Sequence, residues 1–81
     1  MATVNYVKQT ADKISVDYFD LELGTEIFFI APTGKKFPAA AILAGSGSTT
    51  IPIDTLPSGD YYLQARNAGK WAAQTVMFYR K

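Results

Sequence analysis

The sequence predicts an all-β fold, an antiparallel β-sandwich of about seven short strands. Turn residues such as glycine, proline, asparagine and aspartate recur about every 8–12 residues, which is the spacing typical of such a sandwich. Between the turns, apolar and polar residues alternate with a period of two, as in segment 13–19, which indicates strands with one wet face. The one segment with helical propensity, 39–44, is too short to nucleate a stable helix alone, so a strand is expected there.

The composition is that of a small globular domain. The 81 residues are 48% hydrophobic, 14% aromatic and 19% charged. A chain this short buries little more than half of the surface of its unfolded state, so large side chains must supply the core. Five Phe, five Tyr and one Trp are enough to do so. We therefore expect one domain over residues 1–81 that needs neither disulfides nor metal to fold.

The expected strands follow one another from the start of the chain. They cover residues 3–8, 13–19, 25–31, 36–44, 49–53 and 61–66, with a closing strand after residue 70. A break is predicted at 20–24, and the Gly-Ser-Gly-Ser segment 45–48 is predicted to be a flexible loop. Strand 25–31 is apolar on both faces, which indicates a central or partner-facing position. Pro38 and Pro52 restrict their strands to a sheet edge or a bulge.

A short motif near the end of the chain carries a family resemblance. Residues 56–61 read Leu-Pro-Ser-Gly-Asp-Tyr. They resemble the L-P-x-G-x-Y corner of bacterial immunoglobulin-like and fibronectin-type sandwich domains, and more distantly the C-terminal sorting domains of bacterial secreted proteins. The start of the chain lacks the Pro-Asn-Pro opening of the sorting domains. The resemblance implies an immunoglobulin-like sandwich in which Tyr61 begins the penultimate strand and fixes the corner with its hydroxyl group.

The residue types argue against catalysis and against a metal site. The chain has no His and no Cys, which removes the commonest general base, the thiol nucleophile and the thiolate zinc site. Asp54 and Asp60 flank a turn, where capping of local backbone explains them better than a catalytic carboxylate pair. Asp17, Asp20 and Glu22 offer oxygen ligands for Ca²⁺, but their spacing matches no EF-hand loop. We expect no enzyme activity, no cofactor and no metal.

Charge and hydropathy exclude further classes of partner. A formal net charge of +1 gives no field that would favour nucleic acid or a membrane surface. No signal peptide is expected, because the start has neither a basic region nor an apolar run. No segment approaches the ~20 apolar residues of a membrane-spanning helix, so no membrane insertion is expected. These features leave the compartment undetermined.

The outward side of the closing hairpin is unusually aromatic. If Tyr61, Leu63 and Ala65 point into the core, then Tyr62, Gln64 and Arg66 point outward. Strand 25–31 is expected beside them with Phe28 and Ile30 outward. With Val76 and Phe78 in the core, the last strand presents Trp71, Thr75, Met77 and Tyr79. The predicted binding face is therefore Phe28, Tyr62, Gln64, Arg66, Trp71 and Tyr79, with Ile30 and Met77 alongside.

Two interpretations of this aromatic set remain open. So much exposed apolar area, rich in Trp, Tyr and Arg, is typical of a protein–protein interface. The alternative is a bulge in the last strand that turns Trp71, Met77 and Tyr79 into the core.

From the first interpretation, the sequence predicts a non-catalytic interaction or structural module, as in a surface assembly of a cell envelope or virion. Its expected partner is another protein or a second copy of itself. A carbohydrate-binding module using the same aromatics is the alternative, followed by a small inhibitor that occludes a protein partner.

Overall fold

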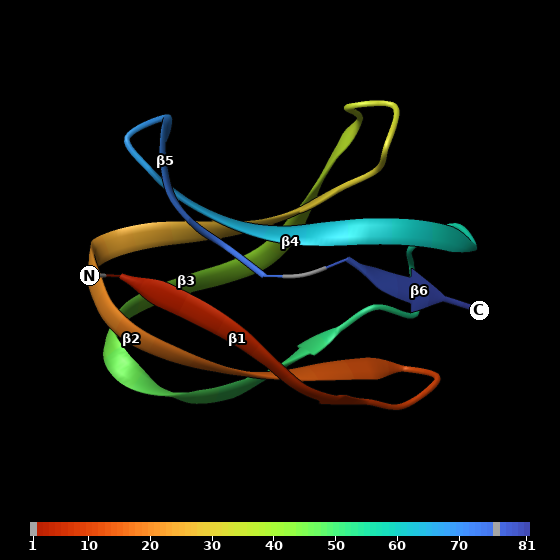
Figure 1. Cartoon of the computed structure of the whole chain (residues 1–81), viewed down its shortest axis with the longest axis horizontal. Coiled ribbons are helices and arrows are strands. Elements are labelled where there is room, and N and C mark those ends of the chain that lie inside the picture. The colour runs from red at the N-terminus through yellow and green to blue at the C-terminus, as the bar shows by residue number, and fades with distance from the viewer. Residues whose placement is uncertain (1, 76) are drawn as a thin grey trace.

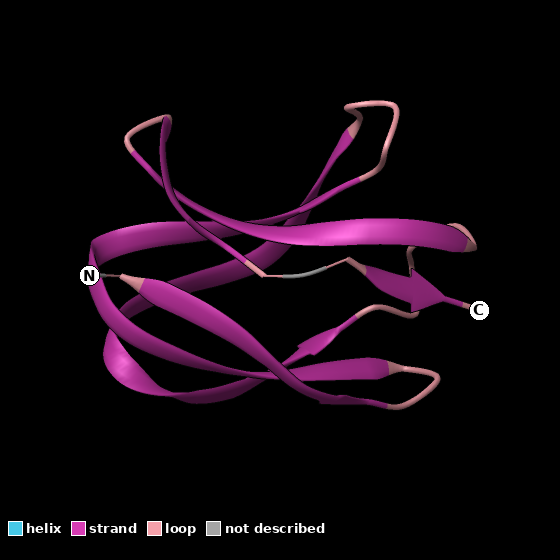
Figure 2. Ribbon diagram, in the orientation of Figure 1, coloured by secondary structure: helices cyan, strands magenta, loops and turns pink. Residues whose placement is uncertain are grey.

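The computed structural model of the protein describes residues 2–75 and 77–81. These residues form strands and connecting turns and contain no helix (Figure 2), so no helix among them could cross a membrane. The strands are β1 (Thr3–Gln9), β2 (Lys13–Ile30), β3 (Lys36–Pro52), β4 (Gly59–Asn67), β5 (Lys70–Gln74) and β6 (Phe78–Arg80).

The long strand β2 is the centre of an antiparallel sheet. β3 pairs with β2 from Lys13 opposite Pro52 to Ile30 opposite Lys36. On its other edge β2 pairs first with β1 and then, from Glu26 onward, with β4. β4 pairs with β6 near its start and with β5 near its end. The strands thus form one curled sheet with the shape of a half-barrel, in which β4 lies across the interior from β1 (Figure 1).

The sheet curls because its two longest strands bend sharply. β2 turns at Asp20 and Gly24, whose φ angles are 58° and 84°, and β3 turns at Gly45, whose φ is 70°. These left-handed values interrupt the regular ladder, and the β2–β3 register shifts on both sides of the pair formed by Leu21 and Gly45. Each bend carries the second half of its strand to the opposite side of the molecule.

Two predictions about chain breaks are therefore wrong. Residues 20–24 are a bend inside β2, and residues 45–48 belong to β3 instead of a flexible loop. The bends are bonded to each other: the amide of Asp20 donates to Ser46 Oγ at 3.0 Å, and Ser48 donates to the Asp17 carboxylate at 2.6 Å. Glycine and serine occur where the backbone changes direction. Such a change is found both in a turn that ends a strand and in a bulge that bends one, so the two could not be distinguished from the residues alone.

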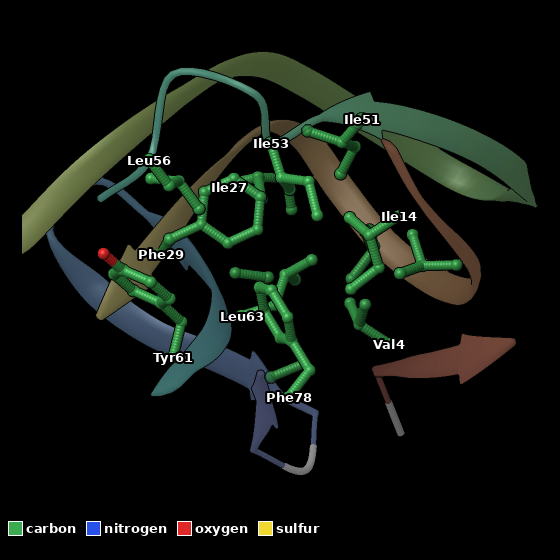
Figure 3. Packing of buried hydrophobic residues seen from close by; sticks show 14 residues of the cluster. Val4, Ile14, Ile27, Phe29, Ile51, Ile53, Leu56, Tyr61, Leu63 and Phe78 are labelled. Carbon is green, nitrogen blue, oxygen red and sulfur yellow. The ribbon is translucent and has the colours of Figure 1, made fainter. Parts of the chain in front are cut away.

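The core lies between the two layers of the curled sheet. One layer contributes Val4, Ile14, Val16 and Ile51, and the other contributes Ile27, Phe29, Leu63, Ala65 and Phe78. In Figure 3 these side chains converge on one cluster, which Ile53, Leu56 and Tyr61 extend toward the β3–β4 connection. The rings of Phe29 and Phe78 meet edge to face, with centroids 5.6 Å apart.

The all-β antiparallel prediction is confirmed, whereas the immunoglobulin-like sandwich of two separate sheets is not. Four of the expected segments merge into the bent strands β2 and β3, and the expected closing strand is divided into β5 and β6. The described residues therefore form six strands in place of about seven.

Tyr61 holds the corner between the β3–β4 connection and β4. Its ring is buried, and its hydroxyl donates to the carbonyl oxygen of Pro57 at 2.6 Å. This hydrogen bond is the role that the sequence predicted for the Tyr61 hydroxyl. The family resemblance from which that role was predicted stays a prediction.

We expect Tyr61→Phe to lower the free energy of unfolding by about 1 kcal/mol, because the ring stays in place and one part-buried hydrogen bond is lost. Urea unfolding followed by far-UV circular dichroism measures this loss. Tyr62→Phe, which removes the same atom from the opposite side of β4, is the matched control and should change stability by less. An equal loss in both variants would contradict the role of the Tyr61 hydroxyl.

Candidate functional site

The side of β4 that faces away from the core carries most of the predicted binding residues. The alternation along β4 is as the sequence predicts. The buried set is Tyr61, Leu63 and Ala65, and the half-buried outward set is Tyr62, Gln64 and Arg66. The neighbouring strands extend this surface, which we call the outer face. It comprises Glu26, Phe28, Ile30, Ile42, Tyr62, Gln64, Arg66, Trp71 and Gln74.

The register of the sheet arranges the outer face in rows that run across the strands. In one row Phe28 of β2 lies opposite Gln64 of β4, which lies opposite Gln74 of β5. In the next row Glu26 lies opposite Arg66, which lies opposite Trp71. Directly opposed residues in antiparallel strands have Cβ atoms about 4.5–5.5 Å apart, so each row is a line of side-chain neighbours.

A chain of hydrogen bonds fixes the polar residues of the outer face. Arg66 Nη1 donates to Gln64 Oε1 at 3.3 Å, and Gln64 Nε2 donates to Gln74 Oε1 at 2.8 Å. Arg66 Nη2 also donates to the carbonyl oxygen of Gly69 at 2.7 Å, in the β4–β5 turn. Because these bonds already hold the guanidinium and the amides, little side-chain entropy remains to be lost when a partner docks.

Large apolar side chains on the outer face remain open to solvent. Trp71 is 53% exposed and Ile42 is 72% exposed. Phe28 and Tyr62 are half-buried, and Phe28 lies beside a groove of about 220 Å³ that Pro38, Ala41 and Ile42 also line. The outer face therefore combines flat aromatic surface with a small apolar depression at its β3 side.

Tyr79 lies at the opposite end of β4 from Trp71, beside the position two residues before Tyr62. It pairs with Asp60 at the start of β4, whereas Trp71 pairs with Arg66 near its end, a separation of about 20 Å at 3.3 Å per residue. Tyr79 is 58% exposed and lines a cleft of about 640 Å³ together with Tyr6, Gln9 and Met77. The register thus places all six predicted residues on the outward side of the sheet, with Tyr79 beyond Tyr62 at one end of β4 and Trp71 at the other.

A bulge explains the register of the last segment. Arg66 lies opposite Trp71 and Ala65 lies opposite Ala73, so Ala72 is the extra residue. The bulge leaves Trp71 exposed and turns Ala73 inward; Thr75, predicted to face outward, is also buried. The prediction for Thr75 is therefore wrong. Phe78 is buried and Met77 is 41% exposed, as expected, while Val76 lies outside the described residues.

Sequence reasoning missed the contribution of β3. Ile42 lies opposite Glu26, and Pro38 lies opposite Phe28. Between these two pairs β3 has two more residues than β2, so strict alternation could not assign a face to either residue. The usable signal was Ile42 itself, the one isoleucine in a run of alanines.

The acidic residues do not assemble a metal site in the part of the chain that the structure describes. No group of three or more His, Cys, Asp or Glu side chains within residues 2–75 and 77–81 is arranged to hold a metal ion. Asp17 instead accepts a hydrogen bond from Ser48, across the β2–β3 ladder.

No protein-family model, no curated protein and no solved structure matches this chain. Its function must therefore be inferred from its own residues.

Proposed function

We propose that this protein is a non-catalytic protein-binding module and that the outer face is its contact surface. The observation that carries the proposal is the pairing of exposed Trp71 with Arg66, in the row of side chains beside the one that contains Phe28. Trp and Arg are enriched among the residues that dominate binding energy at interfaces. Strand-borne side chains fixed by hydrogen bonds suit a surface that must keep its shape.

The chemistry of the outer face favours a protein over a carbohydrate. A sugar platform needs polar groups that are free to bond hydroxyls, but Gln64 and Gln74 already bond each other. Ile42, which is largely exposed, offers an aliphatic surface that suits an apolar protein side chain better than a sugar ring. We infer a partner that presents an apolar anchor to the groove beside Phe28 and an acceptor near Arg66.

The immunoglobulin-like classification and a place in a cell-envelope or virion assembly also remain proposals. The Tyr61 corner and the two facing layers of the curled sheet support the classification.

We expect Trp71→Ala to weaken partner binding by at least about tenfold, because an exposed indole at an interface centre supplies a large share of the contact area. The same change should alter the free energy of unfolding by less than about 1 kcal/mol, since the side chain lies outside the core. Photo-crosslinking identifies the partner for this measurement. A benzophenone amino acid replaces Trp71 in one protein and the exposed turn residue Thr55 in a control protein.

Extracts of the source cells should give a discrete cross-linked protein from position 71 and none from position 55. Unlabelled wild-type protein should compete for the adduct, and the Trp71→Ala protein should compete poorly. Equal adducts from both positions, or equal competition by both proteins, would overturn the proposal. A glycan that shifts Trp71 fluorescence and binds in place of the protein would support the carbohydrate alternative instead.

A further inference from the structure

One edge of the sheet is long and open. β3 pairs with β2 and with no other strand of the described residues. Its second edge therefore presents backbone N–H and C=O groups over a strand of 17 residues. Such an edge is a template on which a further strand can add by backbone hydrogen bonding.

The two halves of this edge differ in how well they are protected. Proteins block open edges with charged side chains, proline and bulges. The first half of β3 has Pro38, an irregular register between Pro38 and Ile42, and the bend at Gly45. The second half, from Gly47 to Pro52, pairs with β2 residue by residue without a shift.

The unprotected half also lacks charge. No Asp, Glu, Lys or Arg occurs anywhere from residue 37 to residue 53. Gly47, Ser48 and Thr50 are exposed, small and uncharged. Pro52 has no N–H to donate, so the stretch able to pair in full is Gly47 to Ile51, with Thr49 at its middle.

We propose that two copies of this protein pair edge to edge through residues 47–51 of β3, antiparallel and centred on Thr49. A two-fold axis through Thr49 makes the interface self-complementary, which is the usual symmetry of a homodimer. The sheet then runs continuously from β1 and β2 of one copy through both β3 strands to β2 and β1 of the other. This surface is separate from the outer face, so the inference does not depend on the proposed function.

The side chains that the proposed pairing brings together are compatible with one another. In this register Ser48 of one copy lies opposite Thr50 of the second copy, and cross-strand hydroxyl pairs of this kind stabilise a sheet. The flanking residues within each copy are Asp17, which accepts a bond from Ser48, and Ser15, which lies within 3.5 Å of Thr50. The Asp17 carboxylate of each copy is therefore separated from the second copy by the hydroxyl groups of Ser48 and Thr50. No two like charges lie opposite each other across the proposed interface.

Cysteine cross-linking tests the register directly, because the chain contains no cysteine of its own. Directly opposed residues of an antiparallel pair have Cα atoms about 4.5–5.5 Å apart, within the range of a disulfide. An oxidised mixture of Ser48→Cys and Thr50→Cys proteins should form the mixed dimer several-fold faster than either protein forms a dimer with itself. Thr55→Cys mixed with Ser48→Cys is the control and should form no preferred product. Equal rates in all mixtures would overturn the proposed register.

Sedimentation velocity of the unmodified protein gives a second, independent readout. We expect a sedimentation coefficient that rises with protein concentration toward that of a dimer. Thr50→Lys should weaken the dimer by at least about tenfold, because the two substituted residues occupy diagonal positions about 7–8 Å apart and their positive charges repel each other. High salt should partly restore the dimer. Thr55→Lys adds the same charge in an exposed turn and should leave the dimer intact. Circular dichroism confirms that each variant is folded. A wild-type protein that stays monomeric at every concentration, or equal weakening by both lysines, would overturn the proposal.

Discussion

Phe29→Ala should destabilise the protein by about 3–5 kcal/mol, the loss typical of removing a fully buried phenylalanine ring. Phe29 is the largest of the fully buried side chains, and its ring meets Phe78 edge to face. It joins β2, the central strand of the sheet, to β6, the shortest strand. A domain of this size has a total stability of only about 4–12 kcal/mol, so the variant should lose much or all of it.

Far-UV circular dichroism in urea is the appropriate measurement, because Trp71 is exposed and its fluorescence reports unfolding poorly. Phe28→Ala is the matched control, since it removes the same ring from the next residue of the same strand. Phe28 lies half-buried on the outer face, so its loss should be less than half as large. If both variants lose the same stability, the assignment of the two faces of β2 is wrong.

Faces of strands could be predicted from the sequence, because alternation is a local property. Tyr61, Leu63 and Ala65 are buried as their spacing predicted, and Trp71 is exposed. Bends could not be predicted in the same way. Gly24 and Gly45 were interpreted as ends of strands, yet both adopt a left-handed conformation inside a strand, and the β2–β3 pairing resumes at Thr25 and Leu43 beyond the bends. Whether a glycine ends a strand or bends it depends on a partner strand that is distant in the sequence.

The residues of the candidate site differ in the same way: local alternation places some of them, and long-range strand pairing places the others. Phe28, Tyr62, Gln64 and Arg66 could be assigned to one surface because each lies in a strand of regular alternation. Tyr79 could not be placed, since the position of β6 at the opposite end of β4 follows from long-range pairing.

The place of Ile42 on the outer face was missed because the pairing of β3 with β2 shifts register between Pro38 and Ile42. Alternation counted from Pro38 therefore does not give the side on which Ile42 lies. Cross-strand register, which decides the neighbours of every side chain, is set by tertiary structure.

Thr25→Val should lower the free energy of unfolding by about 1–3 kcal/mol, although the two side chains have nearly the same shape. Thr25 is completely buried at the bend of β2. Its hydroxyl donates to the carbonyl oxygen of Glu22 at 2.7 Å and accepts from Asn67 Nδ2 at 3.4 Å. Asn67 Nδ2 also donates to the carbonyl oxygen of Leu23 at 3.0 Å. Valine leaves the Glu22 carbonyl without this donor in a part-buried position.

The comparison with Thr25→Ser separates hydrogen bonding from packing. Serine keeps the hydroxyl and loses one buried methyl group, which should cost about 1 kcal/mol and leave the bend bonded. Hydrogen exchange of the amides in residues 20–25 supplies a local measurement: they should exchange faster in Thr25→Val and stay close to wild type in Thr25→Ser. If the valine variant is as stable as wild type with unchanged exchange, the Thr25 hydroxyl does not hold the bend. The curl of the sheet would then rest on the left-handed backbone of Asp20 and Gly24 and on the core packed beneath it.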